Sequence, residues 1–269
     1  MQIQLPYFDV ILARLAAGDT EFQQAFGRHI HFGVWEDAQR ATADLGETAQ
    51  SMETLCQLLL DLADIRPGQS VLDVGCGFGG TLASLNERVQ PLKMTGLNID
   101  ARQLEVARRR AQPLPQNQLE FVEGDACRLP FQDGSFDRVL AVECIFHFPS
   151  RQAFFEHARR VLRPGGNLTI SDFVLPEGTP PAQYDGSTEV LWGPHTAIDL
   201  NQYQQLAEEV GMQLTGGRDI SAHVLPSYDF YGRLLGRYLP EAAEVTRLSK
   251  FFMQAGAFAY CTLRFDLKQ

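Results

Sequence analysis

Short apolar runs, separated by turn residues and amphipathic patterns, occupy the chain from residue 70 onward. Five of these runs are rich in β-branched and aliphatic residues and predict strands at 70–74, 93–99, 119–123, 136–142 and 167–173. Between them, apolar residues recur every three or four positions, which predicts helices with one buried face. Strands that alternate with helices in this way indicate an α/β fold with a parallel sheet.

The region before the first strand is expected to form a helical cap that belongs to the same domain. It covers residues 1–65, and the helical pattern is clearest at 7–17 and 48–63. The remaining residues, 66–269, then form the core of the domain.

Two segments of that core are expected to cover a substrate pocket as lids. Residues 176–200 are rich in proline, glycine and aromatic residues and too irregular for the sheet, whereas residues 226–255 contain two helical stretches. Around these lids, the pattern predicts a helix at 199–210 and strands at 212–220 and 257–267. The last two raise the number of expected strands to seven.

Composition and charge narrow the range of partners. Hydrophobic residues make up 45% and charged residues 21% of the 269 positions, which is typical of a globular protein with a substantial core. The 23 Lys and Arg residues are outnumbered by 33 Asp and Glu residues, and the formal net charge of -10 repels nucleic acid. The one dense basic run, residues 108–110, ends a predicted helix, where cations suit the helix dipole. We therefore expect a small-molecule substrate and no nucleic-acid partner.

Cysteine usage and hydropathy bear on location and on metal binding. The five cysteines form no CxxC pair and no regular ladder, which disfavours both a zinc site and a disulfide framework. The amino terminus lacks a basic stretch followed by an apolar core, and no run reaches the roughly 18 apolar residues of a membrane span. We predict a cytoplasmic protein with reduced thiols, no bound metal and no membrane span.

The first predicted strand runs into a glycine-rich turn, VLDVGCGFGG, at 71–80. Gly75, Gly77 and Gly80 satisfy the GxGxxG pattern, which lets a nucleotide approach the backbone at a helix start. Asp73 would place an anion beside the pyrophosphate of a dinucleotide, which disfavours an NAD(P)-dependent reductase. S-adenosylmethionine has no phosphate and carries an ammonium and a sulfonium group, so the same carboxylate favours this ligand.

Four stretches together resemble the class I S-adenosylmethionine-dependent methyltransferases. They are VLDVGCGFGG, FVEGDACRLPF at 121–131, GSFDRVLAVECIFHF at 134–148 and ARRVLRPGGNLTISDF at 158–173. The resemblance extends over about the whole chain and points to small-molecule methyltransferases, such as those of natural products, sterols, tocopherols and rebeccamycin-type sugars. It implies a Rossmann-like, mostly parallel sheet of seven strands, flanked by helices, with the last strand antiparallel.

The resemblance also implies a set of cofactor-binding residues. Asp125 matches the acid that usually holds the adenine amino group, with the backbone N–H of Ala126 on the ring, although an acid in this position can also serve only the turn. The acid that usually binds the ribose falls at Asn98, and Asp100 is either a second ribose candidate or the cap of the next helix. The segment HIHFGVWED, 29–37, is similar to an element that closes over the methionine part of the cofactor, or else it packs the cap onto the sheet. The residues assigned to the cofactor are Asp73, Gly75, Cys76, Gly77, Gly79, Asn98, Ile99, Gln103, Asp125, Ala126, Glu143, His31 and Trp35.

Two residues are candidates for catalysis. A hydroxyl acceptor must lose a proton, and a histidine is suited to take it near neutral pH. His147 follows the fourth predicted strand, at the edge where open α/β sheets bind their ligands, and Asp172 ends the fifth. Rebeccamycin-type enzymes have a similarly placed pair. Alternatively, His147 only packs or bonds to backbone while alignment of the substrates accounts for catalysis, and Asp172 anchors a turn or lid.

Aromatic residues in the lids and after the strands indicate a largely apolar acceptor. The residues assigned to the substrate are Phe32, Phe146, Phe148, Tyr184, Trp192, His195 and Tyr228. We predict methyl transfer from S-adenosylmethionine to a small hydrophobic or aromatic acceptor, with a natural-product hydroxyl favoured and carbon or nitrogen as alternatives. A cyclase or scaffold that keeps the cofactor without methyl transfer is a further alternative. The oligomeric state stays open, and a homodimer is one of the options.

Overall fold

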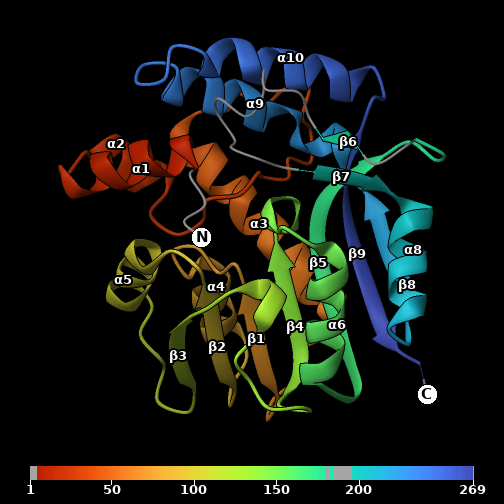
Figure 1. Ribbon diagram of the computed structural model, residues 1–269. Helices are drawn as coiled ribbons and strands as arrows, with labels where there is room; N and C mark the ends of the chain where they lie inside the picture. The colour runs from red at the N-terminus through yellow and green to blue at the C-terminus, as the bar shows by residue number, and fades with distance from the viewer. Residues whose placement is uncertain (1–4, 180–181, 184–195, 269) are drawn as a thin grey trace.

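The computed structural model describes residues 5–179, 182–183 and 196–268 of the chain (Figure 1). Its seven long strands lie in the order β3, β2, β1, β4, β5, β9, β8. Their bounds are β1 (Ser70–Val74), β2 (Lys93–Asn98), β3 (Gln118–Glu123), β4 (Phe136–Val142), β5 (Leu162–Leu175), β8 (Met212–Asp219) and β9 (Ala259–Leu267). β9 pairs antiparallel with both β5 and β8, whereas β3, β2, β1, β4 and β5 pair in parallel. The mostly parallel sheet with an antiparallel last strand is therefore confirmed.

The sheet is larger than expected at one end. β5 runs on to Leu175, and its end pairs in parallel with β7 (Thr196–Asp199), which pairs in turn with β6 (Ala182–Gln183). Within the described ranges the sheet thus has nine strands. The two additional strands fall in the irregular segment 176–200 and are too short to show a periodicity of their own. Three residues assigned to the substrate lie outside the described residues: Tyr184, Trp192 and His195.

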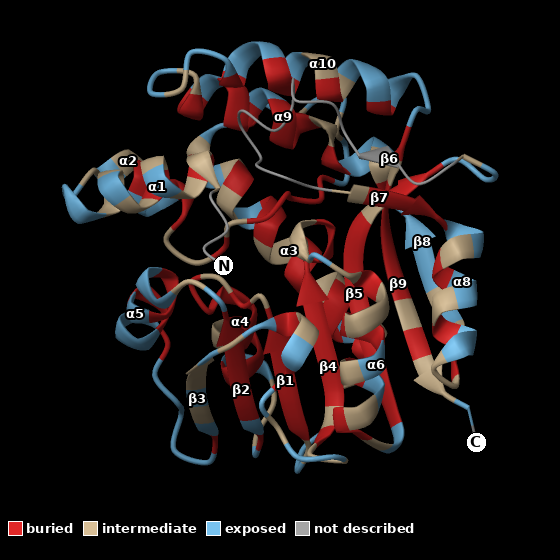
Figure 2. Cartoon of the chain, viewed as in Figure 1, coloured by how far each residue is buried: buried red, intermediate tan, exposed pale blue. Residues whose placement is uncertain are grey.

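Helices cover both faces of the sheet and its carboxyl edge. They are α1 (Pro6–Ala16), α2 (Thr20–Ala25), α3 (Leu45–Ala63), α4 (Gly80–Arg88), α5 (Ala101–Arg110), α6 (Arg151–Val161), α8 (Leu200–Glu209), α9 (Ser221–Leu235) and α10 (Ala242–Gln254). α3 and α4 pack on one face of the sheet through Leu60, Leu82 and Leu85. α6 and α8 pack on the other face through Phe155 and Tyr203. The central strands between these layers are buried along most of their length (Figure 2).

Short polar side chains fix where several helices begin. The carboxylates or hydroxyl of Asp44, Asp100, Ser150 and Asp199 accept hydrogen bonds from backbone N–H groups in the first turns of α3, α5, α6 and α8. The basic run at 108–110 forms the last turn of α5, as expected for cations at a helix end.

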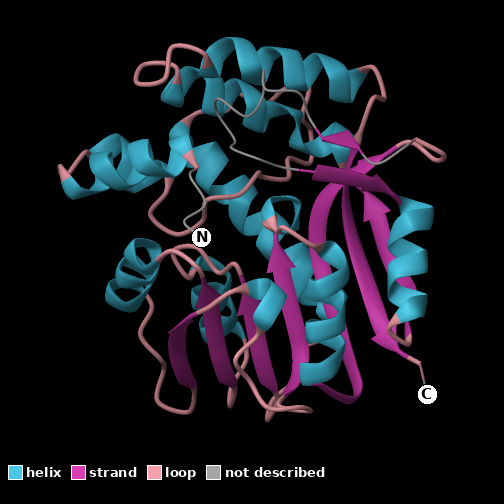
Figure 3. Ribbon diagram, viewed as in Figure 1, coloured by secondary structure: helices cyan, strands magenta, loops and turns pink. Residues whose placement is uncertain are grey.

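A helical layer lies over the carboxyl ends of the strands. It consists of α1 and α2 from the N-terminal region and of α9 and α10 from the second expected lid (Figures 1 and 3). α9 begins at Ser221, before the expected start at Pro226, because the Asp219 carboxylate accepts from the N–H and the hydroxyl of Ser221 and organises the first turn there. Of the helices described, none combines the length and the apolarity needed to cross a membrane.

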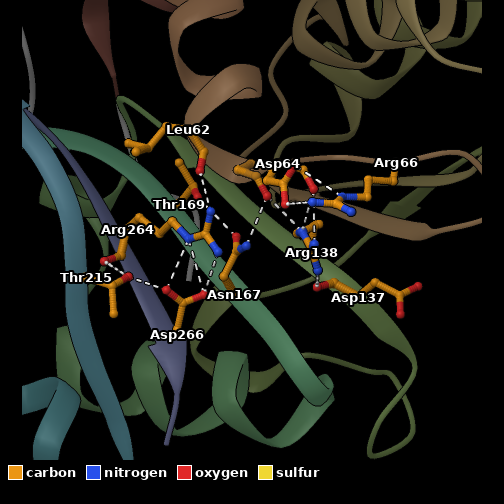
Figure 4. A network of polar contacts seen from close by, with 11 residues as sticks. Leu62, Asp64, Arg66, Asp137, Arg138, Asn167, Thr169, Thr215, Arg264 and Asp266 are labelled. Atoms are coloured by element: carbon orange, nitrogen blue, oxygen red, sulfur yellow. Dashed lines mark hydrogen bonds and ion pairs between the residues drawn. The ribbon is translucent and has the colours of Figure 1, made fainter.

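A polar network fixes α3 at the amino-terminal end of the sheet (Figure 4). The Arg138 guanidinium donates to the carbonyl oxygens of Ala63 (2.8 Å) and Asp64 (3.0 Å), and the Asn167 amide also donates to Ala63 (3.0 Å). Arg264 on β9 donates to the preceding carbonyl of α3 (3.0 Å). These donors satisfy the last carbonyl groups of the helix, and the cations suit its dipole. The long helix is thereby held against three strands.

Candidate active site

A cavity of about 780 Å³ lies at the carboxyl ends of β1, β2 and β4, beneath α1 and the segment 28–31. Its floor is the glycine turn between β1 and α4. Gly75 and Gly77 have φ of +73° and +54°, and a Cβ atom on Gly75 would lie 2.7 Å from the Cys144 Sγ. Cys144 therefore excludes a side chain at Gly75, and the backbone of the turn lines the cavity.

Asp73, near the end of β1, lacks a partner in this cavity. It is 1% exposed, and neither carboxylate oxygen has a hydrogen-bond partner among the described residues. Burial raises the pKa of Asp73 from 3.8 to about 8. A buried polar group without partners is costly until something satisfies it, so the cavity fits a ligand with a cationic donor.

The end of β2 presents amide groups to the cavity. The Asn98 side chain donates to the amide oxygen of Gln103 (3.0 Å) and accepts from the backbone N–H of Asp100 (3.3 Å). All three residues line the cavity, as does Ile99. Asp100 is also the N-cap of α5, since its carboxylate accepts from the N–H of Arg102 (2.9 Å). Amides can both donate to and accept from a diol, so this edge fits a ribose.

The turn after β3 combines the two roles considered for Asp125. Its Oδ1 accepts from the N–H of Cys127 (2.8 Å) and caps the short 3-10 helix η1 (Ala126–Arg128). Asp125 and Ala126 also line the cavity. Capping of the turn and contact with a ligand are therefore compatible.

Glu143 follows β4 and joins the cavity to the cap. Its φ of +50° lies in the left-handed region, which is rare outside glycine and marks positions that the surroundings hold in place. Its Oε2 accepts from the N–H of Phe32 (2.8 Å) and from the Tyr260 hydroxyl. Burial raises the pKa of Glu143 to about 8. The residue lines the cavity and at the same time positions the segment around Phe32.

His147 lies on the short 3-10 helix η2 (Ile145–His147) and lines the cavity. The Tyr7 hydroxyl of α1 is 3.5 Å from its Nε2, and the centroid of the Phe146 ring is 4.3 Å from the imidazole centroid. Phe146 and Phe148 line the same cavity. An imidazole beside a hydroxyl and aromatic rings suits a proton acceptor next to an apolar substrate.

The surroundings of Asp172, the second residue assigned to catalysis, differ from those of His147. It is 0% exposed, and its side chain lies outside the cavity lining. Its Oδ2 accepts from the Arg151 guanidinium (2.9 Å) and from the Tyr203 hydroxyl. Arg151 also donates to the carbonyl oxygen of Thr196 (2.7 Å), and Thr196 lines the cavity. Asp172 is thus connected to the cavity wall through Arg151 and Thr196.

Four more assigned residues lie outside the cavity lining: Gly79, Phe32, Trp35 and Tyr228. Gly79, with φ of +78°, precedes α4 and serves the turn. Phe32 and Tyr228 pack edge to face in the core beneath the cap, with ring centroids 4.8 Å apart. The backbone N–H of Trp35 donates to the His223 carbonyl on α9 (3.0 Å). These contacts fix the cap, because the side chains are buried among its helices.

The cavity brings together the other described residues assigned from the sequence. They are Asp73, Gly75, Cys76, Gly77, Asn98, Ile99, Gln103, Asp125, Ala126, Glu143, His31, Phe146, His147 and Phe148. The sequence analysis missed Tyr7, Arg28 and His29, which line the same cavity. His29 lies in the segment 29–37, which was assigned to the cofactor, so this segment could have identified His29 as a cavity residue. Tyr7 lies in a helix without any motif.

One cluster within the described residues has the composition of a metal site. The ligand atoms of His29, Glu53 and Cys56 lie within 4.8 Å of one another. The Arg28 guanidinium is 3.4 Å from the Glu53 carboxylate, and burial raises the pKa of the Cys56 thiol to about 12. A cation beside the carboxylate and a thiol that keeps its proton both disfavour a divalent metal.

Comparisons with known proteins agree with this geometry. A family model described as a methyltransferase domain matches residues 72–170. An O-methyltransferase of Pyrenophora dematioidea is 34% identical over 200 residues, which cover 73% of each chain. The 27-O-demethylrifamycin SV methyltransferase of Amycolatopsis mediterranei is 30% identical over 241 residues, which cover 87% of this chain and 85% of that protein. The crystal structure of the (4+2)-cyclase SpnF has a TM-score of 0.76 at 20% identity and covers 100% of this chain and 99% of its own, a likeness of fold alone.

Proposed function

This chain belongs to the S-adenosylmethionine-dependent methyltransferases, and we propose that it methylates a hydroxyl group of a small, largely apolar natural product. One relative is named an O-methyltransferase and another a 27-O-demethylrifamycin SV methyltransferase, which supports oxygen as the accepting atom. The observation that carries the proposal is a cavity lined by both a carboxyl without a partner, Asp73, and an imidazole, His147. The carboxyl suits a cationic cofactor, and the imidazole suits an acceptor that must lose a proton.

The residues around the glycine turn fit S-adenosylmethionine. The bare backbone at Gly75 and Gly77 leaves space for its methionine part, and the carboxyl of Asp73 has both oxygens available for an ammonium group. Asn98 and Asp125 would hold the ribose and the adenine at the neighbouring strand ends. When bound, S-adenosylmethionine supplies a methyl group on a positively charged sulfur. The chain must then align the acceptor, remove its proton and exclude water.

His147 is the residue that would take the proton of the acceptor hydroxyl. The Tyr7 hydroxyl, 3.5 Å from Nε2, would hold the imidazole in its orientation. His147 would accept the hydroxyl proton as the acceptor oxygen attacks the methyl group that the bound cofactor would supply, with the sulfur as the leaving atom. Proton removal contributes about 10²- to 10⁴-fold to a rate, and correct alignment can supply up to roughly 7–11 kcal/mol.

The surroundings of His147 favour an apolar acceptor. Phe8 on α1 and the Phe146 and Phe148 rings line the cavity, and α1 covers it from above. Such a wall excludes water and binds hydrocarbon or aromatic surface rather than charged groups.

Labelled methyl transfer tests the proposal directly. The protein is incubated with S-adenosylmethionine carrying a deuterated methyl group and a panel of apolar alcohols, phenols, amines and alkenes, and mass spectrometry locates the label. Label on oxygen supports the proposal, and label on carbon or nitrogen only would overturn it. If no acceptor is labelled although S-adenosylhomocysteine binds, a cyclase that binds the cofactor without methyl transfer becomes the better-supported function.

The role of His147 is tested in the same assay with a matched control. His147→Ala should slow turnover by about 10²- to 10⁴-fold while the affinity for S-adenosylhomocysteine stays within about threefold. His157→Ala, on α6 and outside the cavity lining, should leave both unchanged. Full activity of His147→Ala at neutral pH would exclude His147 as the base.

A further inference from the structure

A buried ion pair lies behind one part of the cavity wall, and the mechanism above makes no use of it. Arg151 and Asp172 are 7% and 0% exposed, and the Arg151 guanidinium donates to the Asp172 Oδ2 (2.9 Å). The Tyr203 hydroxyl donates to the same oxygen and accepts from Arg151 Nε (3.1 Å). All three side chains lie outside the cavity lining, so a ligand can meet this group only through a residue that stands between them.

Arg151 occupies a position that does not favour a cation. It is the first residue of α6, and a positive charge at a helix N-terminus opposes the helix dipole. Burial removes its hydration as well, which costs free energy even with Asp172 as the counter-ion. The helix does not require it, because the Ser150 hydroxyl already caps the first turn by accepting from the N–H of Ala153 (3.0 Å). This cost indicates that Arg151 serves a contact beyond the helix.

That contact is Thr196, the first residue of β7. Arg151 Nη2 donates to the carbonyl oxygen of Thr196 (2.7 Å), and Nη1 donates to its hydroxyl. Two bonds from one rigid guanidinium hold the backbone and the side chain of Thr196 in one orientation. Thr196 is half-buried and lines the cavity. It is therefore the residue through which the ion pair reaches a ligand.

The bond from Arg151 determines what the Thr196 hydroxyl can do. A hydroxyl has one hydrogen and two lone pairs, and a guanidinium only donates, so Thr196 Oγ1 accepts from Arg151 and keeps its own hydrogen for another acceptor. Among the described residues, no atom accepts that hydrogen. The cation also polarises the hydroxyl, which strengthens it as a donor. The cavity wall thus has an oriented hydrogen-bond donor at Thr196.

This donor lies on the side of the cavity assigned to the acceptor. β7 lies next to η2, the short helix that carries His147. The lining residues adjacent in sequence to Tyr7 and His147 are apolar: Leu5, Pro6, Phe8, Phe146, Phe148 and Pro149. A hydrogen-bond donor in such a wall orients an apolar ligand, because a ligand that leaves the donor unpaired loses free energy.

The ion pair also limits what the donor can bind. Arg151 and Asp172 together carry no net charge, so they offer no excess positive charge to an anion. The apolar wall around His147 likewise disfavours a carboxylate or a phosphate. A neutral carbonyl oxygen, which only accepts hydrogen bonds, is the complementary group.

We propose that the acceptor substrate carries a carbonyl oxygen close to the hydroxyl that is methylated, and that the Thr196 hydroxyl donates to this oxygen. Thr196 then determines specificity, and Arg151 and Asp172 are positioning residues behind it. The inference rests on the proposed function, because it names the substrate class of the same site.

Matched pairs of probes measure this donor. The meta and para isomers of hydroxyacetophenone carry a carbonyl group on the phenol ring, and the corresponding ethylphenols have a methylene group in its place. A second set pairs linear hydroxy ketones with alcohols of the same chain length. Thr196→Val should lower kcat/KM for the ketones about 5- to 50-fold and change it less than about threefold for their partners. The difference in acidity between the phenols cancels, because each probe is compared with itself in two proteins.

Three further variants separate this role from a structural one. Thr196→Ser keeps the hydroxyl and should retain wild-type kcat/KM for the ketones. The double variant Arg151→Gln with Asp172→Asn removes both charges together, leaves no unpaired buried charge, and should slow the ketones more than their partners. Thr54→Val makes the same substitution on α3, outside the lining, and should leave every probe unchanged. Wild-type affinity for S-adenosylhomocysteine shows that a variant is folded.

The outcomes are distinct. Equal slowing of both members of each pair by Thr196→Val would mean that Thr196 only maintains the wall, and unchanged kcat/KM would mean that its hydroxyl is not used. Methylation by the wild type of apolar alcohols but of none of the ketones is a third contrary result. Each of these overturns the inference and leaves the proposed function intact. If S-adenosylhomocysteine binds but no alcohol or phenol is methylated, the proposed function fails as well.

Discussion

Replacing Asp73 by asparagine should make the ligand-free protein more stable and its cofactor complex weaker. Burial raises the pKa of Asp73 from 3.8 to about 8, so between these pH values the folded protein holds a proton that the unfolded chain releases. Stability therefore falls as pH rises through this window, and the effect is absent below it, where both states are protonated. At 1.36 kcal/mol per pH unit, the free energy of unfolding is lowered by about 4 kcal/mol at pH 7. Asparagine has a similar shape and no proton to release.

Two measurements test this expectation. Denaturant unfolding of the ligand-free proteins should give Asp73→Asn an advantage of about 2 kcal/mol at pH 5 and about 4 kcal/mol at pH 7. Calorimetry with S-adenosylhomocysteine should show affinity lowered about 10- to 100-fold in the variant, because the ammonium group loses its carboxylate. Wild-type binding at pH 7 should release about 0.9 proton, measured in buffers of different ionisation enthalpy, and the variant should release none.

Asp172→Asn is the matched control, because Asp172 is as deeply buried but paired. Neutralising it leaves the buried Arg151 without its counter-ion and should lower the free energy of unfolding by about 3–5 kcal/mol. An Asp73→Asn variant that is no more stable than wild type at pH 7 would refute the reasoning. So would unchanged affinity for S-adenosylhomocysteine together with no proton release from the wild type.

Two further expectations concern the cap and α3. Tyr7→Phe removes the hydroxyl beside His147 and should slow methyl transfer roughly tenfold in a turnover assay. The affinity for S-adenosylhomocysteine, measured by calorimetry, should not change. A change in affinity instead of turnover would contradict this expectation. Arg138→Met removes the donors to the last carbonyl groups of α3 and should lower the free energy of unfolding, measured in denaturant, by about 2–3 kcal/mol. The affinity for the ligand should stay the same, because this network lies at the end of the sheet opposite the cavity. Unchanged stability would contradict this expectation.

The sequence sufficed for features whose signals are local. Runs of apolar residues predicted the seven core strands, and the glycine turn with Asp73 predicted where the cofactor binds. Each of these signals lies within a few neighbouring residues. Local signals of this kind do not determine the direction in which the Asp172 side chain points. Successive side chains of a strand face opposite sides, so Ser171 on β5 contacts Tyr260 while Asp172 turns toward Arg151 on α6. The position along β5 was predictable, but which side faces the cavity depends on the packing of distant helices.

The same reason explains why the sequence analysis missed Tyr7 and why Trp35 lies outside the cavity lining. Tyr7 and His147 meet across 140 positions of sequence, and no periodicity reports such a contact. Trp35 was assigned to the cofactor from a resemblance, but its backbone bonds to His223 on α9 and its side chain is buried in the cap. Contacts between the cap and the lid helices are set by tertiary packing, which a pattern of single positions does not record.

The place of β9 has a consequence for how this molecule is assembled. β8 is translated well before β9, yet in the described sheet β9 is its sole neighbour and separates it from β5. A nascent chain that stops short of residues 259–267 leaves β8 unable to join the sheet. The chain between these two strands forms α9 and α10, so insertion of β9 completes the sheet and fixes both ends of this helical segment in one step. Shortening the carboxyl terminus by that one strand should therefore cost the protein both β8 at the outer edge of its sheet and the attachment of α9 and α10.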